Sequence, residues 1–360
     1  MISMIKENPF KQIYHIYGIH RSGLAATLFG GLVALGLWLD AAAGPAAVRN
    51  LVLRLNFPDP FLLEADGRIH AYATNSGALR VQVSSSSDLE HWSAPTEALA
   101  RLPAWVNPDR PDVWAPEVLR VDSNYVLYFS ARSRSLTRPD GIGRLCIGTA
   151  VSARPDRDFV PRDAPLICDE FAEGVIDVSP FRDGDRLYLY YKNDGNCCKR
   201  ATQIFARELD STGLATVGDA TALGVSNDQP WEGDVIEAPT MFKHAGAYYL
   251  FYSANAYDKP GYAVGYARCE GPLGPCKDAS TQPLLKTPAQ PVGWFGPGHQ
   301  SLLQFKGRTV IAYHAWNVLP DGQRDRCRAM HISEIKWSGT GEPSIELDVE
   351  LADEWRCPSH

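Results

Sequence analysis

The chain has 360 residues and carries 35 basic against 42 acidic side chains, a formal net charge of -7. This acidic balance, with no glycine-rich phosphate loop and no basic cluster in the sequence, argues against a nucleic-acid or phosphate ligand. Hydrophobic residues make up 45% of the chain and charged residues 21%, a composition that supplies a large packed core and excludes extended disorder beyond the start of the chain.

Residues 1–48 are predicted to be an export or anchoring segment. Residues 24–39 are apolar and uncharged, follow Lys6, Lys11 and Arg21, and precede three alanines at 41–43. A basic start, an apolar stretch and small residues after it are typical of a cleaved signal peptide, and an uncleaved membrane anchor is the alternative. Either one places residues 49–360 outside the cytosol, secreted or in the periplasm, with a membrane contact only through such an anchor.

From residue 56 onward, one sequence unit recurs five times with a spacing of about sixty residues. Each copy opens with a short segment around a proline or glycine and continues into an alternating, aromatic-rich run that predicts a β-strand. The opening segments are 57–61, 114–118, 176–181, 236–242 and 298–302, and the aromatic runs are 68–73, 125–129, 186–191, 247–252 and 309–314. Three or four strands per unit, with turns between them, predict an all-β, five-bladed β-propeller. A β-helix, the competing repeat fold, has far shorter units.

Three of the five opening segments carry a carboxylate: Asp59, Asp177 and Glu237. The innermost strand of each propeller blade lines the central axis, so we expect these three acids to converge on one pocket. Carboxylates held together in a pocket differ in acidity, because burial and like charge raise the pKa of some of them. Hydrolysis of a glycosidic bond requires one protonated and one ionised carboxyl group. Each acid alone is typical of a turn or a strand end, but their registered recurrence predicts a catalytic site.

Taken in order, these segments resemble glycoside hydrolase family 43. The resemblance covers about residues 56–337 and rests on segments 56–61, 113–118, 175–181, 235–241 and 296–301. It implies a five-bladed propeller that hydrolyses arabinofuranosides, xylosides and related plant cell-wall linkages with inversion at the anomeric carbon, and that requires no cofactor. It also implies that Asp59 is the general base that activates water, that Glu237 is the general acid, and that Asp177 tunes and orients Glu237.

The same resemblance implies roles for two further residues. His299 corresponds to a histidine that reaches the propeller axis and often contacts a bound structural calcium or its water shell. A hydrogen-bonded structural histidine is the alternative, because calcium prefers oxygen ligands. Arg328 corresponds to an arginine that contacts the sugar, with Arg326 and Arg324 as alternatives because the preceding loop varies in length.

Aromatic residues next to the acids are candidates for the walls that stack on sugar rings. Trp114 and Trp294 lie nearest the predicted rim, and we expect them to be substrate-binding platforms. Phe61, Phe181 and Phe242 occupy equivalent positions in their repeats, and we expect them to pack between blades.

The chain contains eight cysteines, an even number that permits disulfides in an exported protein. Cys269 and Cys276 flank a turn and are the easiest local pair, and Cys146 with Cys168 is a second candidate pair. For the adjacent cysteines at 197–198, a structural disulfide from one of them is favoured over a zinc or redox site.

These observations predict an exported, monomeric, inverting glycoside hydrolase that acts on an arabinose- or xylose-containing oligosaccharide or polysaccharide. An α-L-arabinofuranosidase or arabinanase is favoured over a β-xylosidase. A non-catalytic sugar-binding propeller is the alternative from another class, although binding alone does not require three acids.

Overall fold

The computed structural model of the protein describes residues 50–279, 281–289, 293–347 and 355–358. The predicted signal or anchor segment at 1–48 lies outside the described residues. Within the part of the chain that the structure describes, no helix is long and apolar enough to cross a membrane.

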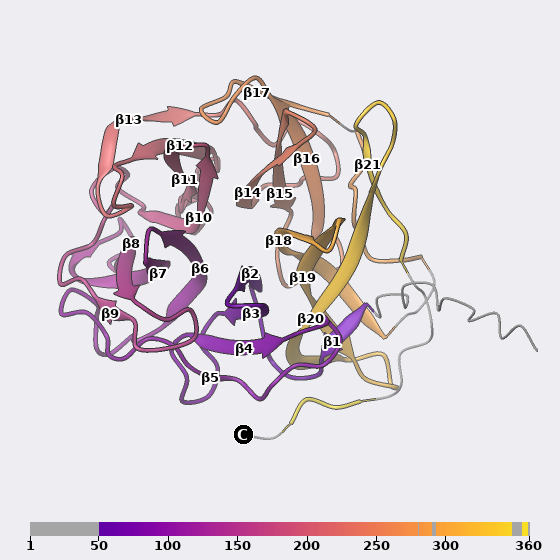
Figure 1. The fold of residues 1–360 in the computed structure, drawn as a ribbon, viewed down its shortest axis with the longest axis horizontal. Coiled ribbons are helices and arrows are strands. Elements are labelled where there is room, and N and C mark those ends of the chain that lie inside the picture. Colours follow the sequence, from indigo (N-terminus) through magenta and orange to yellow (C-terminus); the bar gives the residue numbers. More distant parts are fainter. Residues whose placement is uncertain (1–49, 280, 290–292, 348–354, 359–360) are drawn as a thin grey trace, which may run out of the picture. The chain divides into compact units, whose positions relative to one another are not determined.

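Five antiparallel sheets form the blades of a β-propeller, as predicted (Figure 1). Blade 1 contains β2 (Phe61–Ala65), β3 (Arg68–Ala73), β4 (Gln82–Ser86) and β5 (Thr96–Glu97). Blade 2 contains β6 (Val113–Val121), β7 (Asn124–Thr137), β8 (Gly143–Ser152) and β9 (Val160–Pro161). Blade 3 contains β10 (Val175–Asp183), β11 (Arg186–Asn193), β12 (Ile204–Leu209) and β13 (Thr216–Ala222), and blade 4 contains β14 (Ile236–His244), β15 (Ala247–Ala254), β16 (Ala263–Cys269) and β17 (Cys276–Asp278).

Blade 5 joins the two ends of the described chain. It contains β18 (Trp294–Phe305), β19 (Arg308–Val318) and β20 (Arg324–Trp337), and β21 (Pro343–Ile345) pairs with part of β20. The strand β1 (Leu51–Leu53) also pairs with β20, through Leu51 opposite His331 and Leu53 opposite Met330 (Figure 1). The ring of blades is therefore closed by hydrogen bonds between the first strand and the last blade.

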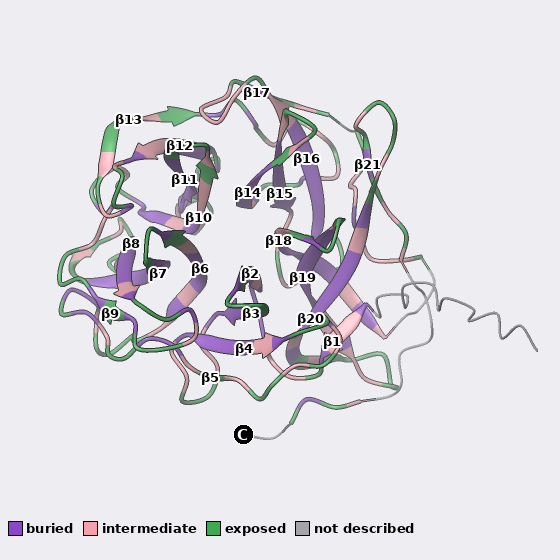
Figure 2. Cartoon of the chain, in the orientation of Figure 1, coloured by how far each residue is buried: buried purple, intermediate pink, exposed green. Residues whose placement is uncertain are grey.

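Each pair of neighbouring blades encloses its own hydrophobic cluster. The second strands of the blades are buried along nearly their whole length, because both of their faces are covered by other strands (Figure 2). This sandwiching explains why tyrosine and phenylalanine dominate the aromatic runs. As expected, Phe61, Phe181 and Phe242 all contact these clusters.

Tight turns join the strands within each blade. The turn between β2 and β3 places Asp66 at a φ of 53° and Gly67 at a φ of 73°. Two successive left-handed residues form the type of hairpin turn that matches strand twist, and Asp-Gly is a favoured sequence for it. Such turns keep the strands of a blade short and in register.

All eight cysteines form disulfides. The predicted pairs Cys146–Cys168 and Cys269–Cys276 are both present, and Cys327 pairs with Cys357. The two adjacent cysteines, Cys197 and Cys198, are bonded to each other, an arrangement that the sequence argument did not include.

Candidate active site

The five inner strands share a backbone irregularity at the same end. One non-glycine residue in each repeat has a left-handed backbone, with φ between 47° and 59°: Asp59, Ala115, Asp177, Ala238 and His299. In blades 2 to 5 the strand ladder shifts register around this residue. Such β-bulges redirect side chains at strand ends. The predicted acids therefore lie at this repeated left-handed position, which Asp59 and Asp177 occupy themselves and which Glu237 precedes by one residue.

A side chain of the neighbouring blade holds the backbone N–H at several of these bulges. The N–H of Ala115 donates to Thr74 Oγ1 at 2.8 Å, and the N–H of Ala238 donates to Asp177 Oδ2 at 3.0 Å. The N–H of Asp59 donates to His314 Nδ1 at 3.1 Å, so that ring nitrogen is an acceptor. These bonds lock adjacent blades together and place Asp177 directly beside the backbone of Glu237.

The bulges surround a cavity of about 360 Å³ to which all five blades contribute. This volume lies within the range of small-molecule sites. The lining includes four carboxylates and four permanent cations: Asp59, Asp177, Asp194, Glu237, Arg132, Arg138, Lys192 and Arg328. The charges balance one another, an arrangement that suits a neutral ligand with many hydroxyl groups.

Asp59 is the most strongly ionised carboxylate of the cavity. Arg328 Nη1 donates to its Oδ1 at 3.0 Å, Thr74 Oγ1 donates to its Oδ2, and His299 Nδ1 lies 3.4 Å from Oδ1. Burial opposes ionisation, but the charge of Arg328, together with His299, outweighs it and holds the pKa of Asp59 well below its ordinary value. Asp59 is therefore an anion at neutral pH.

Asp177 is buried and Glu237 is mostly buried, and the two carboxyl groups have opposite protonation tendencies. Burial raises the pKa of Asp177 to about 6, and the charge of Glu237 adds to this rise. For Glu237, burial is outweighed by Lys192 and by the hydroxyl of Tyr262, and its pKa is lowered. Lys192 Nζ lies 3.1 Å from Glu237 Oε2, and Tyr262 donates to Oε1 at 2.8 Å. Two adjacent carboxyl groups with pKa values pushed apart are typical of acid–base sites.

Of the residues predicted to contact substrate, the cavity contains Trp114 and Arg328. Arg328 is the arginine that reaches Asp59, whereas Arg324 stacks on the ring of Trp316 and Arg326 donates to the backbone carbonyl of Cys357. Of these three arginines, Arg328 lines the cavity, and Arg324 and Arg326 do not.

The expected position of Trp294 is wrong, because this side chain does not line the cavity. Trp294 is 9% exposed and packs against Tyr313 and His331, with ring centroids 6.4 Å and 5.3 Å away. It lies at the start of β18, where it pairs with Asn317, five residues before the bulge at His299. At that distance from the bulge, its ring packs inside blade 5.

His299 lies in the cavity beside Asp59, as expected, but its surroundings do not fit a directly bound calcium ion. Calcium prefers several oxygen ligands. The carboxylate nearest His299, Asp59, already binds the guanidinium of Arg328. Among the described residues, acidic side chains gather at metal-binding distance at Asp228, Glu232 and Asp278, none of which lines this cavity.

Sequence reasoning did not single out several residues of the cavity, above all Lys192, Tyr262 and His314. Lys192 is a charged residue that directly follows the buried, apolar and aromatic run 187–191 of β11, and a charge at such a position indicates a functional role. His314 ends an aromatic run and Tyr262 directly precedes β16, and nothing local distinguishes either of them from core residues.

Comparison with known proteins places the chain in one enzyme family. The model of the family described as "Glycosyl hydrolases family 43" matches residues 48–343. A solved structure described as a thermostable family-43 glycoside hydrolase shares 28% sequence identity and a TM-score of 0.71, over 85% of this chain and 97% of that one.

Two relatives represent different named activities. The "Extracellular endo-alpha-(1->5)-L-arabinanase 1" of Bacillus subtilis is 23% identical over 361 residues, which cover 95% of this chain and 100% of the relative. The "Beta-xylosidase" of Xylanibacter ruminicola is 24% identical over 259 residues, which cover 64% of this chain and 72% of the relative.

Proposed function

This chain belongs to glycosyl hydrolase family 43 and is a glycoside hydrolase, and from that premise we propose that it cleaves arabinose-containing plant polysaccharides with inversion at the anomeric carbon. The observation that carries the proposal is the meeting of Asp59, Asp177 and Glu237, from three blades, in one cavity. The three carboxylates differ in protonation, as acid–base hydrolysis requires.

In the proposed reaction, Asp59 is the general base. Its carboxylate is ionised, and it accepts a proton from the water that attacks the anomeric carbon. Arg328 and Thr74 hold the carboxylate in place through bonds to its two oxygens. Inversion follows because water attacks from the face opposite to the leaving group.

Glu237 is the proposed general acid that protonates the departing oxygen. Its bond to Lys192 favours the ionised form in the free cavity, while the neighbouring Asp177 retains a proton to about pH 6. The two carboxyl groups titrate as a pair, so the charge of Asp177 tunes the protonation of Glu237, and its bond to the N–H of Ala238 orients the backbone next to Glu237. The reaction needs only these carboxyl groups and water, and no cofactor takes part in it.

An arabinose-containing substrate is favoured by the relative named as an endo-arabinanase, which aligns with this chain over 95% of its length. A xylose-containing substrate is the second candidate, because another relative is named as a β-xylosidase. Both pentoses are candidates, because the balanced charges of the cavity disfavour charged ligands but do not distinguish one neutral sugar from another.

We also propose that the enzyme acts outside the cytosol and as a monomer. Four disulfides favour an oxidising compartment. The arabinanase of Bacillus subtilis is named as extracellular. Export through the segment at 1–48 accounts for both observations.

The deciding experiment is hydrolysis by the purified protein of para-nitrophenyl α-L-arabinofuranoside, para-nitrophenyl β-D-xyloside and linear arabinan. Turnover of the arabinose substrates, with the inverted anomer as the first product by proton NMR, is the expected result. Glu237→Ala should abolish turnover of arabinan while leaving the circular dichroism spectrum unchanged. Failure to turn over any of the three substrates would refute the proposal, and turnover of the xyloside alone would establish the second candidate.

A further inference from the structure

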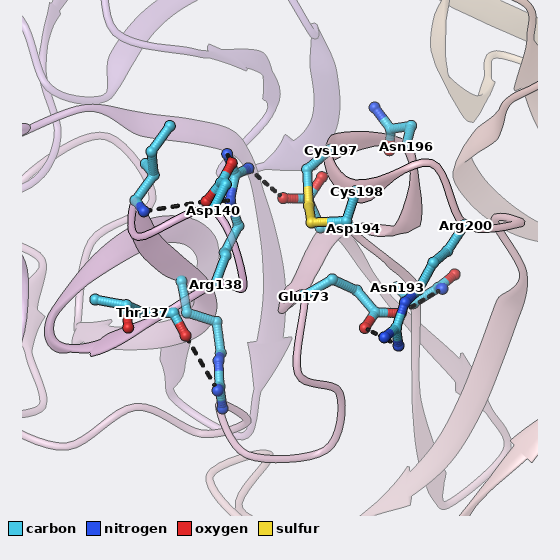
Figure 3. The surroundings of a disulfide bond; sticks show 12 residues. Thr137, Arg138, Asp140, Glu173, Asn193, Asp194, Asn196, Cys197, Cys198 and Arg200 are labelled. Atoms are coloured by element: carbon cyan, nitrogen blue, oxygen red, sulfur yellow. Dashed lines mark hydrogen bonds and ion pairs between the residues drawn. A yellow bond between two sulfur atoms is a disulfide. The ribbon is translucent and has the colours of Figure 1, made fainter.

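The connection between β11 and β12 carries a disulfide between adjacent residues at the wall of the cavity. Cys197 and Cys198 end the 3-10 turn Gly195–Cys198, and both are half-buried. Cys197 is one of the residues that line the cavity. Figure 3 shows the bonded sulfur atoms beside Asp194.

The loop that carries this disulfide is fastened to the rest of the site. Asp194 Oδ2 accepts a bond from Arg138 Nη1 at 3.0 Å (Figure 3), and Asn196 Oδ1 accepts one from Lys192 Nζ at 2.8 Å. Lys192 in turn binds Glu237. Asn196, which directly precedes Cys197, is thus connected through Lys192 to the proposed general acid, and this link fixes the position of the disulfide relative to Glu237.

The lining side chains that hydrogen-bond with this loop are polar or charged, whereas the apolar lining residues Leu145 and Ile176 come from β8 and β10. The polar and charged residues include Arg138, Lys192, Asp194 and Asn196, which are engaged with one another and with Glu237. Hydroxyl groups of a sugar can bond to such residues, but the C–H groups of its ring need an apolar surface. Sulfur is soft, polarisable and apolar. The bond between neighbouring cysteines also ties the two sulfur atoms together as one rigid surface.

We propose that the Cys197–Cys198 disulfide is a specificity-determining wall of the sugar site, which packs against the C–H face of the sugar held beside Glu237. This inference rests on the proposed function, since it takes a pentose-containing oligosaccharide as the ligand. The alternative role is a brace that only stiffens the turn.

Two replacements separate a contacting wall from a brace. Cys197→Ser/Cys198→Ser removes both the cross-link and the apolar surface, whereas Cys197→Val/Cys198→Val removes the cross-link and keeps an apolar surface. If the disulfide contacts the sugar, the double serine variant should raise KM for arabinotriose about tenfold with kcat nearly unchanged. The double valine variant should raise KM distinctly less, because it keeps an apolar surface. Equal KM values for the two pairs, or a serine pair with the KM of the unaltered protein, would overturn the proposal.

The matched control is Cys269→Ser/Cys276→Ser, which removes the disulfide between β16 and β17, away from the cavity lining. We expect this control to lower the thermal midpoint without changing KM. A similar rise of KM in the control would mean that loss of any disulfide perturbs the site, and would count against the wall.

A second measurement uses the unaltered protein and does not depend on the folding of a variant. A phosphine reductant is added with and without arabinotriose, and freed cysteines are alkylated and counted by mass spectrometry. Bound sugar should slow the reduction of Cys197–Cys198 and leave that of Cys269–Cys276 unchanged. If the protein hydrolyses arabinotriose but Cys197–Cys198 is reduced at the same rate with and without the sugar, the wall is refuted and the proposed substrate is not. If the protein does not hydrolyse arabinotriose and the sugar has no effect on reduction, the proposed substrate is refuted as well.

Discussion

Lys192 and Glu237, from neighbouring blades, form an ion pair whose lysine side chain is only 1% exposed. Burial disfavours the charged lysine, but Glu237, Asp177 and Asp194 outweigh it and raise its pKa. A permanent positive charge thus lies against the proposed proton donor, where it stabilises the ionised form of Glu237. The pH at which the pair of carboxyl groups loses its proton depends on this lysine.

The first prediction follows from removing that charge. In Lys192→Met, the carboxyl pair retains its proton to higher pH, because the ammonium group no longer favours the anion. The alkaline limb of the profile of kcat/KM against pH should therefore shift to higher pH by about one pH unit or more. The measurement is hydrolysis of para-nitrophenyl α-L-arabinofuranoside across a pH series.

Lys199→Met is the matched control, because Lys199 is exposed, lies in the loop that follows the strand of Lys192 and does not line the cavity. Its profile should coincide with that of the unaltered enzyme. An alkaline limb that stays in place in Lys192→Met would show that Lys192 does not set the protonation of the donor.

The second prediction separates the proposed acid from the proposed base. Glu237→Gln should lower kcat on arabinotriose about a thousandfold, but only about tenfold on a dinitrophenyl arabinofuranoside, whose leaving group departs without protonation. Asp59→Asn should lower kcat by similar factors on both substrates, because water activation is needed for each. Steady-state rates on the two substrates give the comparison, and equal losses in Glu237→Gln would contradict its role as acid.

The third prediction concerns Arg328 and Asp59. The lowered pKa of Asp59 means that its ionised form stabilises the fold above its ordinary pKa, and that this contribution is lost as pH falls through the lowered value. Arg328→Met should raise the pKa of Asp59 and move the acidic limb of kcat/KM to higher pH. Arg324→Met removes the same charge nearby without touching Asp59 and should leave the limb in place. If the acidic limbs of the two variants lie at the same pH, Arg328 does not set the pKa of Asp59.

The fourth prediction contrasts two tryptophans. Trp294→Ala should lower the free energy of unfolding by about 3 kcal/mol with no change in KM, because the ring fills space inside blade 5. Trp114→Ala should raise KM for arabinotriose about tenfold, because this ring lines the cavity. Chemical denaturation and steady-state kinetics measure the two effects. A larger KM effect in Trp294→Ala than in Trp114→Ala would contradict both assignments.

The five-bladed fold follows from the sequence because each repeat carries the same opening segment and the same aromatic run. The repeat also predicts that Asp59, Asp177 and Glu237 lie at one end of the axis, and all three line the one cavity. The prediction that Trp294 binds substrate is wrong because a side chain reaches the cavity only when it lies close to the bulge, and nearness to the rim in the sequence is not sufficient. Trp114 immediately precedes a bulge residue, whereas Trp294 does not.

Interactions between blades could not be predicted from the sequence. The contact of Lys192 with Glu237 and the bond of Asp59 to Arg328 depend on the angles between sheets, which no local pattern encodes. The pairing of Cys197 with Cys198 was missed because adjacent cysteines rarely adopt the backbone that permits it, so a distant partner was expected.

Because Arg328 comes from β20, the cavity that we propose as the active site is one of the last parts of the molecule to form during synthesis. Asp59 belongs to the first blade to leave the ribosome, but its partner Arg328 belongs to β20, 269 residues later. Four blades can be complete while the ring is still open and the base still lacks its guanidinium. A chain interrupted before residue 324 would therefore retain most of its strands and all three acids, yet have no assembled site.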